Sequence, residues 1–160
     1  MDSEQKAKGS LLKRIRSVLF LLPAWFAPLS KLRVFFHRLR GVKIGKNVEI
    51  GYFCIIGNVH PHMITIEDEA VVTAGAVLLE HDNAYYFTRG GEVKFGPVII
   101  KRKSFIGLHS VIMPNVTVGE RSIVGANSVV LRDIPPDSVF AGVPAREIKK
   151  MSDTDENIKH

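Results

Sequence analysis

His81 is the residue of this chain best suited to proton transfer, and it stands in the stretch LLEHDNAYYFTRGGEVKFG, residues 78–96. An unperturbed imidazole has a pKa near ~6.5, so it can take up and return a proton at neutral pH. A histidine can also bind a metal ion, or simply occupy a loop. The residue type alone therefore leaves three roles open: general base, metal ligand or loop residue.

Other side chains suited to metal binding are few. His60 and His62 lie in the segment NVHPH, and His109 lies further along the chain. Three histidines can hold a catalytic zinc ion, so a metal site that also includes His81 stays open as an alternative. The single cysteine, Cys54, excludes an intramolecular disulfide and a multi-cysteine zinc site.

The elements that must position these residues follow from a repeat of six. A branched aliphatic residue recurs every six positions in three series, at 44–56, 66–78 and 100–130. This period fits neither an α-helix nor a long strand, but it suits a short strand and a turn repeated around a coil. Three such faces close a coil of 18 residues. We therefore predict a parallel β-helix, an all-β core, with these stacked pairs: Ile100 on Val118, Ile106 on Val124 and Ile112 on Val130.

Small residues accompany the repeat. Glycine directly follows several of the repeating aliphatic residues, as at Gly51 and Gly107, and we expect it to permit turn conformations that other residues resist. Mostly small residues such as Cys54 come four positions after them, and we expect these to complete a narrow interior. Because that interior has no room for a ligand, chemistry is expected outside the coil or between subunits.

Two interruptions of the repeat mark candidate functional segments. The gap between Ile56 and Ile66 is ten residues, and the gap between Leu78 and Ile100 is 22. The second gap contains His81, three positions after the last repeating residue. Long loops in compact domains are often functional, and this one is long enough to reach a neighbouring subunit.

Three segments around these interruptions resemble a known family. They are MITIEDEAVVTAGAVLLEHD, FIGLHSVIMPNVTVGERSIVGANSVVLRDIPP and VFAGVPAREIKK, and the resemblance covers residues 42–150. The chain is similar to the hexapeptide-repeat (left-handed β-helix) acyltransferases, in particular the maltose and galactoside O-acetyltransferases and the acetyltransferases of polysaccharide biosynthesis. The resemblance implies a left-handed coil, against the usual right-handed crossover rule, and a homotrimer with active sites between subunits.

The resemblance also implies a reaction. It points to an acetyl-CoA-dependent O-acetyltransferase that acts on a sugar or glycan hydroxyl by direct transfer, without an acyl-enzyme and without a metal. His81 is expected to be the general base. What orients His81 stays open between Glu80, Asp82 and a main-chain carbonyl.

Substrate contacts follow from the same resemblance. The positions similar to the family's CoA contacts are Leu108, Ala126, Leu131, Arg132, Arg146 and Lys149. The three cationic residues among them could meet the phosphates of CoA. Asp82, His60 and Tyr85 are candidate contacts of the acceptor.

Three alternatives to this function remain. The first is N-acetylation of an amino sugar, which the same base and cosubstrate could perform. The second is a metalloenzyme similar to the γ-class carbonic anhydrases, which share this coil. The third is a β-helix that serves as a non-catalytic scaffold.

The basic charge of the chain is concentrated in an N-terminal arm, residues 1–41. Residues 1–40 contain nine Lys and Arg against Asp2 and Glu4, a net charge of +7, whereas the remainder has a net charge of −1. No nucleic-acid recognition motif accompanies this charge, so no nucleic-acid partner is expected. The uncharged run 17–30 is shorter than the roughly 20 residues that span a bilayer. No convincing signal-peptide cleavage site follows this run, and we expect a cytoplasmic protein, with a peripheral position at the inner face of the membrane left open.

The second half of the arm reads as a helix with its apolar residues, Leu32, Phe35, Phe36 and Leu39, on one face. Two compatible roles remain open for the arm. It can cap the end of the β-helix, or residues 11–40 can contact the inner face of a membrane peripherally.

The domain organisation completes these expectations. Residues 42–150 form the β-helix domain, from which residues 79–99 leave as a loop. The segment AREIKKM is expected to close the far end as a short C-terminal helix. The polar residues 151–160 are expected to be a disordered tail.

Overall fold

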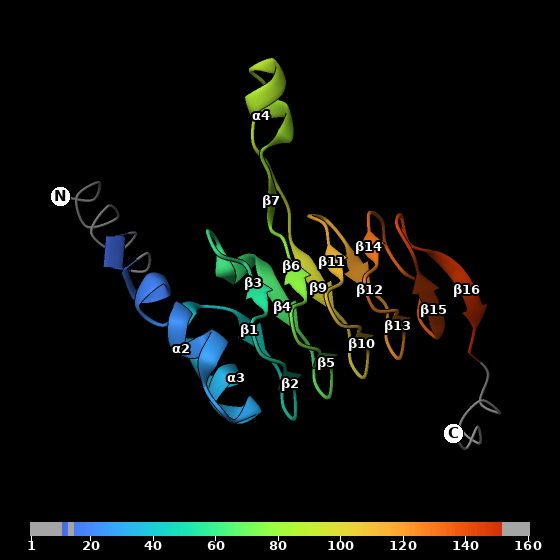
Figure 1. The fold of residues 1–160 in the computed structure, drawn as a ribbon, viewed down its shortest axis with the longest axis horizontal. Coiled ribbons are helices and arrows are strands. Elements are labelled where there is room, and N and C mark those ends of the chain that lie inside the picture. Colours follow the sequence, from blue (N-terminus) through green and yellow to red (C-terminus); the bar gives the residue numbers. More distant parts are fainter. Residues whose placement is uncertain (1–10, 13–14, 152–160) are drawn as a thin grey trace.

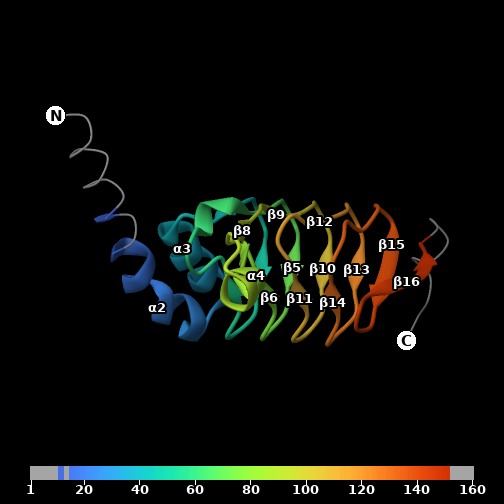
Figure 2. The same ribbon diagram turned by 90° about the horizontal axis from the view of Figure 1, so that it is seen from above.

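The six-residue repeat forms short strands that stack into three parallel sheets, which wrap around one long axis (Figures 1 and 2). The computed structural model describes residues 11–12 and 15–151. Sheet A contains β1 (Lys43–Ile44), β4 (Ile64–Ile66), β9 (Val98–Ile100) and β12 (Thr117–Val118). Sheet B contains β2 (Glu49–Ile50), β5 (Val71–Val72), β10 (Phe105–Ile106), β13 (Ile123–Val124), β15 (Ser138–Ala141) and β16 (Arg146–Lys150). Sheet C contains β3 (Ile55–Ile56), β6 (Val77–Leu78), β11 (Val111–Ile112) and β14 (Val129–Val130).

The strand register confirms the predicted stacking. The three predicted pairs, Ile100 with Val118, Ile106 with Val124 and Ile112 with Val130, are partners across neighbouring parallel strands. All six of these side chains are almost fully buried. Cys54 is also fully buried, and burial raises the pKa of its thiol to about 11. The core is therefore a continuous column of aliphatic and small side chains, and Cys54 belongs to its wall.

The expected reason for the glycines is confirmed at Gly57, whose φ angle is +49°, but is wrong for Gly51 and Gly107. Gly51 and Gly107 do not have positive φ angles; the left-handed turn conformation falls two residues later, at Phe53 and His109. A Cβ on Gly51 would lie 2.3 Å from the backbone nitrogen of Ala74 in the next coil. Glycine is needed here because adjacent coils approach too closely for any side chain.

Two helices of the N-terminal arm cover the first coil, as α2 (Leu21–Phe26) and α3 (Ser30–Arg40). Each coil donates its N–H groups to the carbonyls of the following coil, so the first coil has carbonyls with no strand to pair with. Arginines of α3 supply the missing donors on all three sheets. Arg38 donates to Ile44, Arg33 to Ile50 and Arg40 to Ile56.

This arrangement shows the helix to be a cap, and it reverses the orientation expected of an amphipathic helix. The side chains of α3 that are buried are Arg33, Val34, His37 and Arg40, whereas Leu32 and Phe35 are exposed. Guanidinium groups face inward because the end of a β-helix presents carbonyl oxygens rather than an apolar surface. Within the described residues, no helix is long and apolar enough to cross a bilayer.

The far end of the β-helix differs from the expectation. Residues 146–150 form the strand β16, antiparallel to β15, and not a short C-terminal helix. Five residues make too few hydrogen bonds to stabilise an isolated helix, whereas the free edge of β15 offers a ladder. The expected disordered tail falls, apart from Met151, outside the described residues.

Candidate functional site

The expected loop of residues 79–99 leaves the coil as a hairpin that projects away from the three sheets (Figure 1), except that its last two residues, Val98 and Ile99, belong to β9 of sheet A. Its stalk is formed by β7 (His81–Asp82) and β8 (Lys94–Phe95), which pair antiparallel. Its tip is the helix α4 (Ala84–Arg89), which ends at Gly90 in the left-handed conformation. His81 therefore lies at the base of the stalk, where the chain leaves the coil.

A buried carboxylate lies beside His81. Glu80 is 1% exposed, and its Oε1 lies 3.3 Å from Nδ1 of His81. The geometry of this contact is not that of a good hydrogen bond, and Nδ1 has no other partner among the described residues. Because Nδ1 is buried against Glu80, Nε2 is the ring nitrogen left to act on a substrate.

The carboxylate of Glu80 is held ionised by its surroundings. Its Oε1 accepts hydrogen bonds from the backbone N–H groups of Val59 (2.8 Å) and His60 (2.9 Å). Burial tends to raise the pKa of Glu80, but these N–H donors, its own N–H and the neighbouring His81 outweigh burial and lower it. A carboxylate next to Nδ1 favours the tautomer with the proton on Nδ1, which leaves a lone pair on Nε2.

The N-terminal cap reaches this site through Arg40. The guanidinium of Arg40 donates to the carbonyls of Ile56 and Gly57 and to the side chain of Asn58. These three residues begin the ten-residue gap, and the N–H groups of the next two residues, Val59 and His60, donate to Glu80. Burial lowers the pKa of Arg40 to about 10, while the attraction of Glu80 opposes that shift. Helix α3 thus supports the segment that positions Glu80.

One aromatic ring, that of Phe95, lies near both His81 and His60. The ring centroid of Phe95, on the opposite strand of the stalk, lies 5.9 Å from that of His81 and 5.0 Å from that of His60. The ring of His62, in the short 3₁₀ helix η1 (Pro61–Met63), lies 5.7 Å from that of His60. The two interruptions of the repeat therefore meet in space, which places His60 close to His81.

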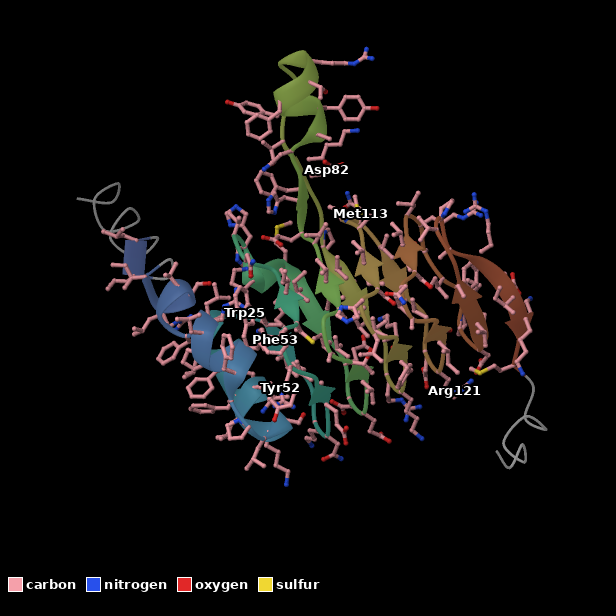
Figure 3. All side chains as sticks on the ribbon, viewed as in Figure 1. Trp25, Tyr52, Phe53, Asp82, Met113 and Arg121 are labelled. Atoms are coloured by element: carbon pink, nitrogen blue, oxygen red, sulfur yellow. The ribbon has the colours of Figure 1, made fainter. Side chains whose placement is uncertain are left out.

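The other two candidate acceptor contacts lie further along the hairpin. Asp82 lies on the stalk above the coil (Figure 3), and its Oδ1 accepts the N–H of Ala84 at the start of α4. Tyr85 is half exposed on α4, and its ring centroid lies 4.6 Å from Nζ of Lys94. Both residues support the hairpin in the isolated chain, and neither contacts His81.

The six candidate CoA contacts do not gather around His81. Leu108 and Ala126 lie on stacked turns at the corner between sheets B and C, where the N–H of Asn127 donates to the carbonyl of Leu108. Leu131 and Arg132 follow β14, at the corner between sheets C and A that the hairpin also leaves. Arg146 and Lys149 lie on β16 at the far end. All six residues are exposed in the single chain.

His109, the last histidine of the alternative metal site, lies at another place in the fold. His109 occupies the turn between β10 and β11, with its ring against Gly75 of the preceding coil. His81, by contrast, leaves the corner after β6. Within the described residues, no group of three or more His, Cys, Asp and Glu side chains is arranged to hold a metal ion.

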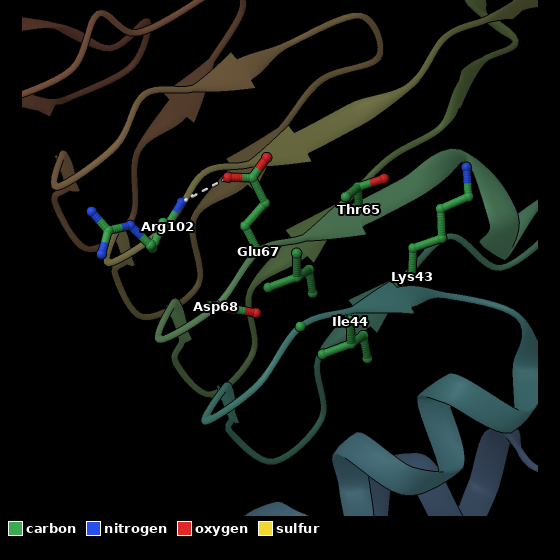
Figure 4. A pocket seen from close by; sticks show the side chains of 8 residues that line it. Lys43, Ile44, Thr65, Glu67, Asp68 and Arg102 are labelled. Atoms are coloured by element: carbon green, nitrogen blue, oxygen red, sulfur yellow. Dashed lines mark hydrogen bonds between the residues drawn. The ribbon is translucent and has the colours of Figure 1, made fainter.

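Two open hollows lie away from the hairpin, along sheet A. The first, of about 360 Å³, contains Lys43, Asp68 and Arg102 (Figure 4). Glu67 separates it from the second and accepts hydrogen bonds from Lys101 and from the N–H of Arg102. Because the carboxylates of Glu67 and Asp68 are already paired with Lys101 and with backbone N–H groups, we assign no chemistry to the hollows.

Sequence reasoning left Glu80 undecided and missed Phe95 and Arg40. Adjacent strand residues point to opposite faces, which argued against a contact between Glu80 and His81. The contact forms because Glu80 precedes β7, at the bend where the chain leaves the coil. Its only signal in the sequence is a carboxylate beside the histidine where the repeat breaks.

Two family models match this chain. The model described as bacterial transferase hexapeptide (six repeats) matches residues 97–132. The model described as hexapeptide repeat of succinyl-transferase matches residues 41–80. Together they cover most of the repeat on both sides of the hairpin.

Known proteins resemble this chain over most of its length. Galactoside O-acetyltransferase of Escherichia coli (strain K12) is 32% identical over 97% of this chain and 74% of its own. The solved structure of a galactoside acetyltransferase in complex with coenzyme A is 27% identical over 95% of this chain and 87% of that one, with a TM-score of 0.72. A hexapeptide-repeat acetyltransferase of Vibrio cholerae shares the fold, with a TM-score of 0.74 at 24% identity over 91% of this chain and 94% of that one.

Proposed function

Because this chain belongs to the hexapeptide-repeat acetyltransferases, which are left-handed parallel β-helices, we propose that it transfers an acetyl group from acetyl-CoA to a hydroxyl of a sugar or glycan. Membership of the family supports acetyl transfer from acetyl-CoA, without specifying the acceptor. The sugar hydroxyl is supported by the relative that acts on galactosides and by an active-site region that holds one histidine beside a carboxylate. The observation that carries the mechanism is the contact between Glu80 and His81.

The proposed reaction is a direct transfer. Nε2 of His81 takes the proton of the acceptor hydroxyl as its oxygen attacks the thioester carbonyl. The C–O bond forms, the C–S bond breaks, and the proton passes from His81 to the leaving thiolate of CoA. Glu80 stabilises the imidazolium that forms in between, as a buried carboxylate does beside a catalytic histidine.

We propose that the complete site lies between subunits of a homotrimer. The hairpin carries exposed aromatic residues at its tip, Tyr85, Tyr86 and Phe87, and projects from its own coil. The proposed CoA contacts Leu108 and Ala126 lie at the opposite edge of sheet C from His81. A neighbouring subunit would supply the second half of each site. Since the cosubstrate is a metabolite of the cytoplasm, we place the reaction there.

The test of His81 uses a matched pair of variants. His81→Asn is expected to lower the rate of acetyl transfer by at least about 100-fold, because a general base contributes 10²–10⁴. His160→Asn changes a histidine that lies outside residues 42–150 of the sequence, and is expected to retain the rate. The measurement is thiol released from acetyl-CoA over a panel of sugars and amino sugars, with CoA binding and mass as controls. Equal rates for both variants would exclude His81 as the base.

The same panel separates the acceptor classes. Thiol release with simple sugars supports transfer to a hydroxyl, and mass spectrometry locates the ester. Release with amino sugars alone, giving an amide, would replace the proposed hydroxyl acceptor with an amine.

A further inference from the structure

The N-terminal arm turns its apolar side chains away from its own β-helix. Helix α3 buries three polar residues against the first coil, while Leu32 and Phe35 are 40% and 51% exposed. The described residues before α3 continue this pattern with further exposed apolar side chains: Leu11, Leu12, Ile15, Val18, Leu19, Leu22, Phe26 and Leu29. The arm thus presents its apolar side outward over its whole described length.

This exposure is concentrated and not scattered. Ten of the 22 exposed large apolar side chains in the described part of the chain lie in the arm. Single exposed apolar residues are normal on a protein surface, whereas a grouped set marks an interaction site. The β-helix does not cover them, because α3 already uses its inward side to cap the carbonyls of the first coil.

The charge of the same segment selects the kind of partner. Residues 5–41 of the arm contain nine Lys and Arg and no Asp or Glu. Among them, Arg16 and Lys31 are exposed beside the apolar residues. Lys6 and Lys8 precede the apolar residues in the sequence, and Lys13 and Arg14 lie among them. Two copies of this surface facing each other would set cations against cations with no carboxylate to pair with them. Lipid phosphates would instead pair with these cations.

We propose that the arm is a membrane-docking element that binds the surface of an anionic phospholipid bilayer. Its aliphatic and aromatic side chains enter the boundary of the acyl chains, and its Lys and Arg meet the headgroups. Pro23 and Pro28 interrupt the apolar run, which suits an element that lies in the interface. The arm leaves the end of the β-helix and the hairpin of His81 leaves its side, so docking leaves the hairpin free (Figure 1). The proposal does not depend on the identity of the acetyl acceptor.

The test is co-sedimentation of the full-length protein with vesicles. We expect binding to vesicles of phosphatidylcholine with phosphatidylglycerol, weakened by added salt, and little binding to phosphatidylcholine alone. The double variant Leu32→Ser with Phe35→Ser is expected to lower binding about tenfold or more, since both side chains would otherwise be removed from water. The matched control, Val143→Ser with Ile148→Ser, removes two exposed apolar residues outside the arm and is expected to bind like wild type.

A second variant guards against misfolding of the first. Lys31→Glu reverses one exposed charge of the arm and is expected to weaken binding at low salt. Failure of the wild type to bind anionic vesicles, or equal binding by wild type and both arm variants, would overturn the proposal. If the double variant binds vesicles like wild type but forms a smaller assembly in solution, the surface is a contact between copies of the chain. Thiol release with soluble acceptors, measured in parallel, tests the acetyltransferase function separately.

Discussion

At the scale of single residues, the proposed mechanism depends on a carboxylate that is almost fully buried. Glu80 receives two backbone N–H groups from the segment of His60 and lies against Nδ1 of His81. Its lowered pKa keeps it ionised at neutral pH. One side chain therefore joins the two interruptions of the repeat, and its charge favours the His81 tautomer with the proton on Nδ1.

Glu80→Gln tests this role. The amide oxygen can still accept the two N–H groups, so the fold should persist while the charge beside His81 is lost. We expect kcat to fall at least about tenfold, with KM for acetyl-CoA little changed, because the imidazolium loses its partner. The control Glu69→Gln changes an exposed carboxylate. An unchanged kcat in Glu80→Gln would contradict a positioning role.

The same variant has a defined pH dependence in its stability. A carboxylate whose folded-state pKa is lowered stabilises the fold above its ordinary value, about 4.3, and loses that contribution as pH falls through the folded value. The free energy of unfolding of wild type should therefore exceed that of Glu80→Gln most at neutral pH. The difference in unfolding free energy should shrink as the pH falls below about 4.3.

At the scale of elements, helix α3 is a polar cap built around a neutral histidine. His37 is fully buried, and its Nδ1 accepts a hydrogen bond from Arg40 at 3.0 Å. Burial, followed by the charges of Arg40 and Arg33, lowers the pKa of His37 to about 3. The cap therefore requires the uncharged imidazole, and acid should weaken its packing on the first coil.

His37→Asn tests this dependence. In the unfolded chain His37 takes up a proton near pH 6.5, whereas in the folded chain it does not until about pH 3, so stability falls as pH drops between these values. At pH 5 this amounts to about 2 kcal/mol. Urea unfolding followed by the emission of Trp25, the single tryptophan, reports on the arm. Wild type and His109→Asn should lose this stability between pH 7 and 5, and His37→Asn should lose much less.

At the scale of the whole molecule, one chain separates the two halves of its proposed site. His81 leaves the corner between sheets C and A, whereas Leu108 and Ala126 lie at the corner between sheets B and C. In a closed ring of three subunits, one edge of each chain meets the other edge of its neighbour. Each active site would then combine His81 of one subunit with Leu108 and Ala126 of the next.

Complementation between two inactive variants tests this sharing. His81→Asn removes the base, and Ala126→Glu sets bulk and negative charge against the CoA polyanion. Trimers that contain both variants should show about one third of wild-type activity, because each mixed trimer has one intact site of three. Co-expression of the two variants, purified through separate tags, provides the material. Activity no higher than that of each variant alone would place the whole site within one subunit.

The amino-acid sequence by itself determined the coil and the position of His81. A period of six specifies which side chains point inward, and the strand register confirms the stacking in every predicted pair. The repeat is local information, so it can be read without the fold. The break in the repeat is local as well, and it marks where the hairpin leaves the coil.

Only the tertiary structure decided how the ends and the site are built. The carbonyls of the first coil are unpaired only once the coil has formed, and they turn Arg33 and Arg40 inward and Leu32 and Phe35 outward. The free edge of β15 likewise converts an expected helix into a strand. Glu80 meets His60 and His81 because two distant interruptions of the repeat fall side by side, which no local pattern records.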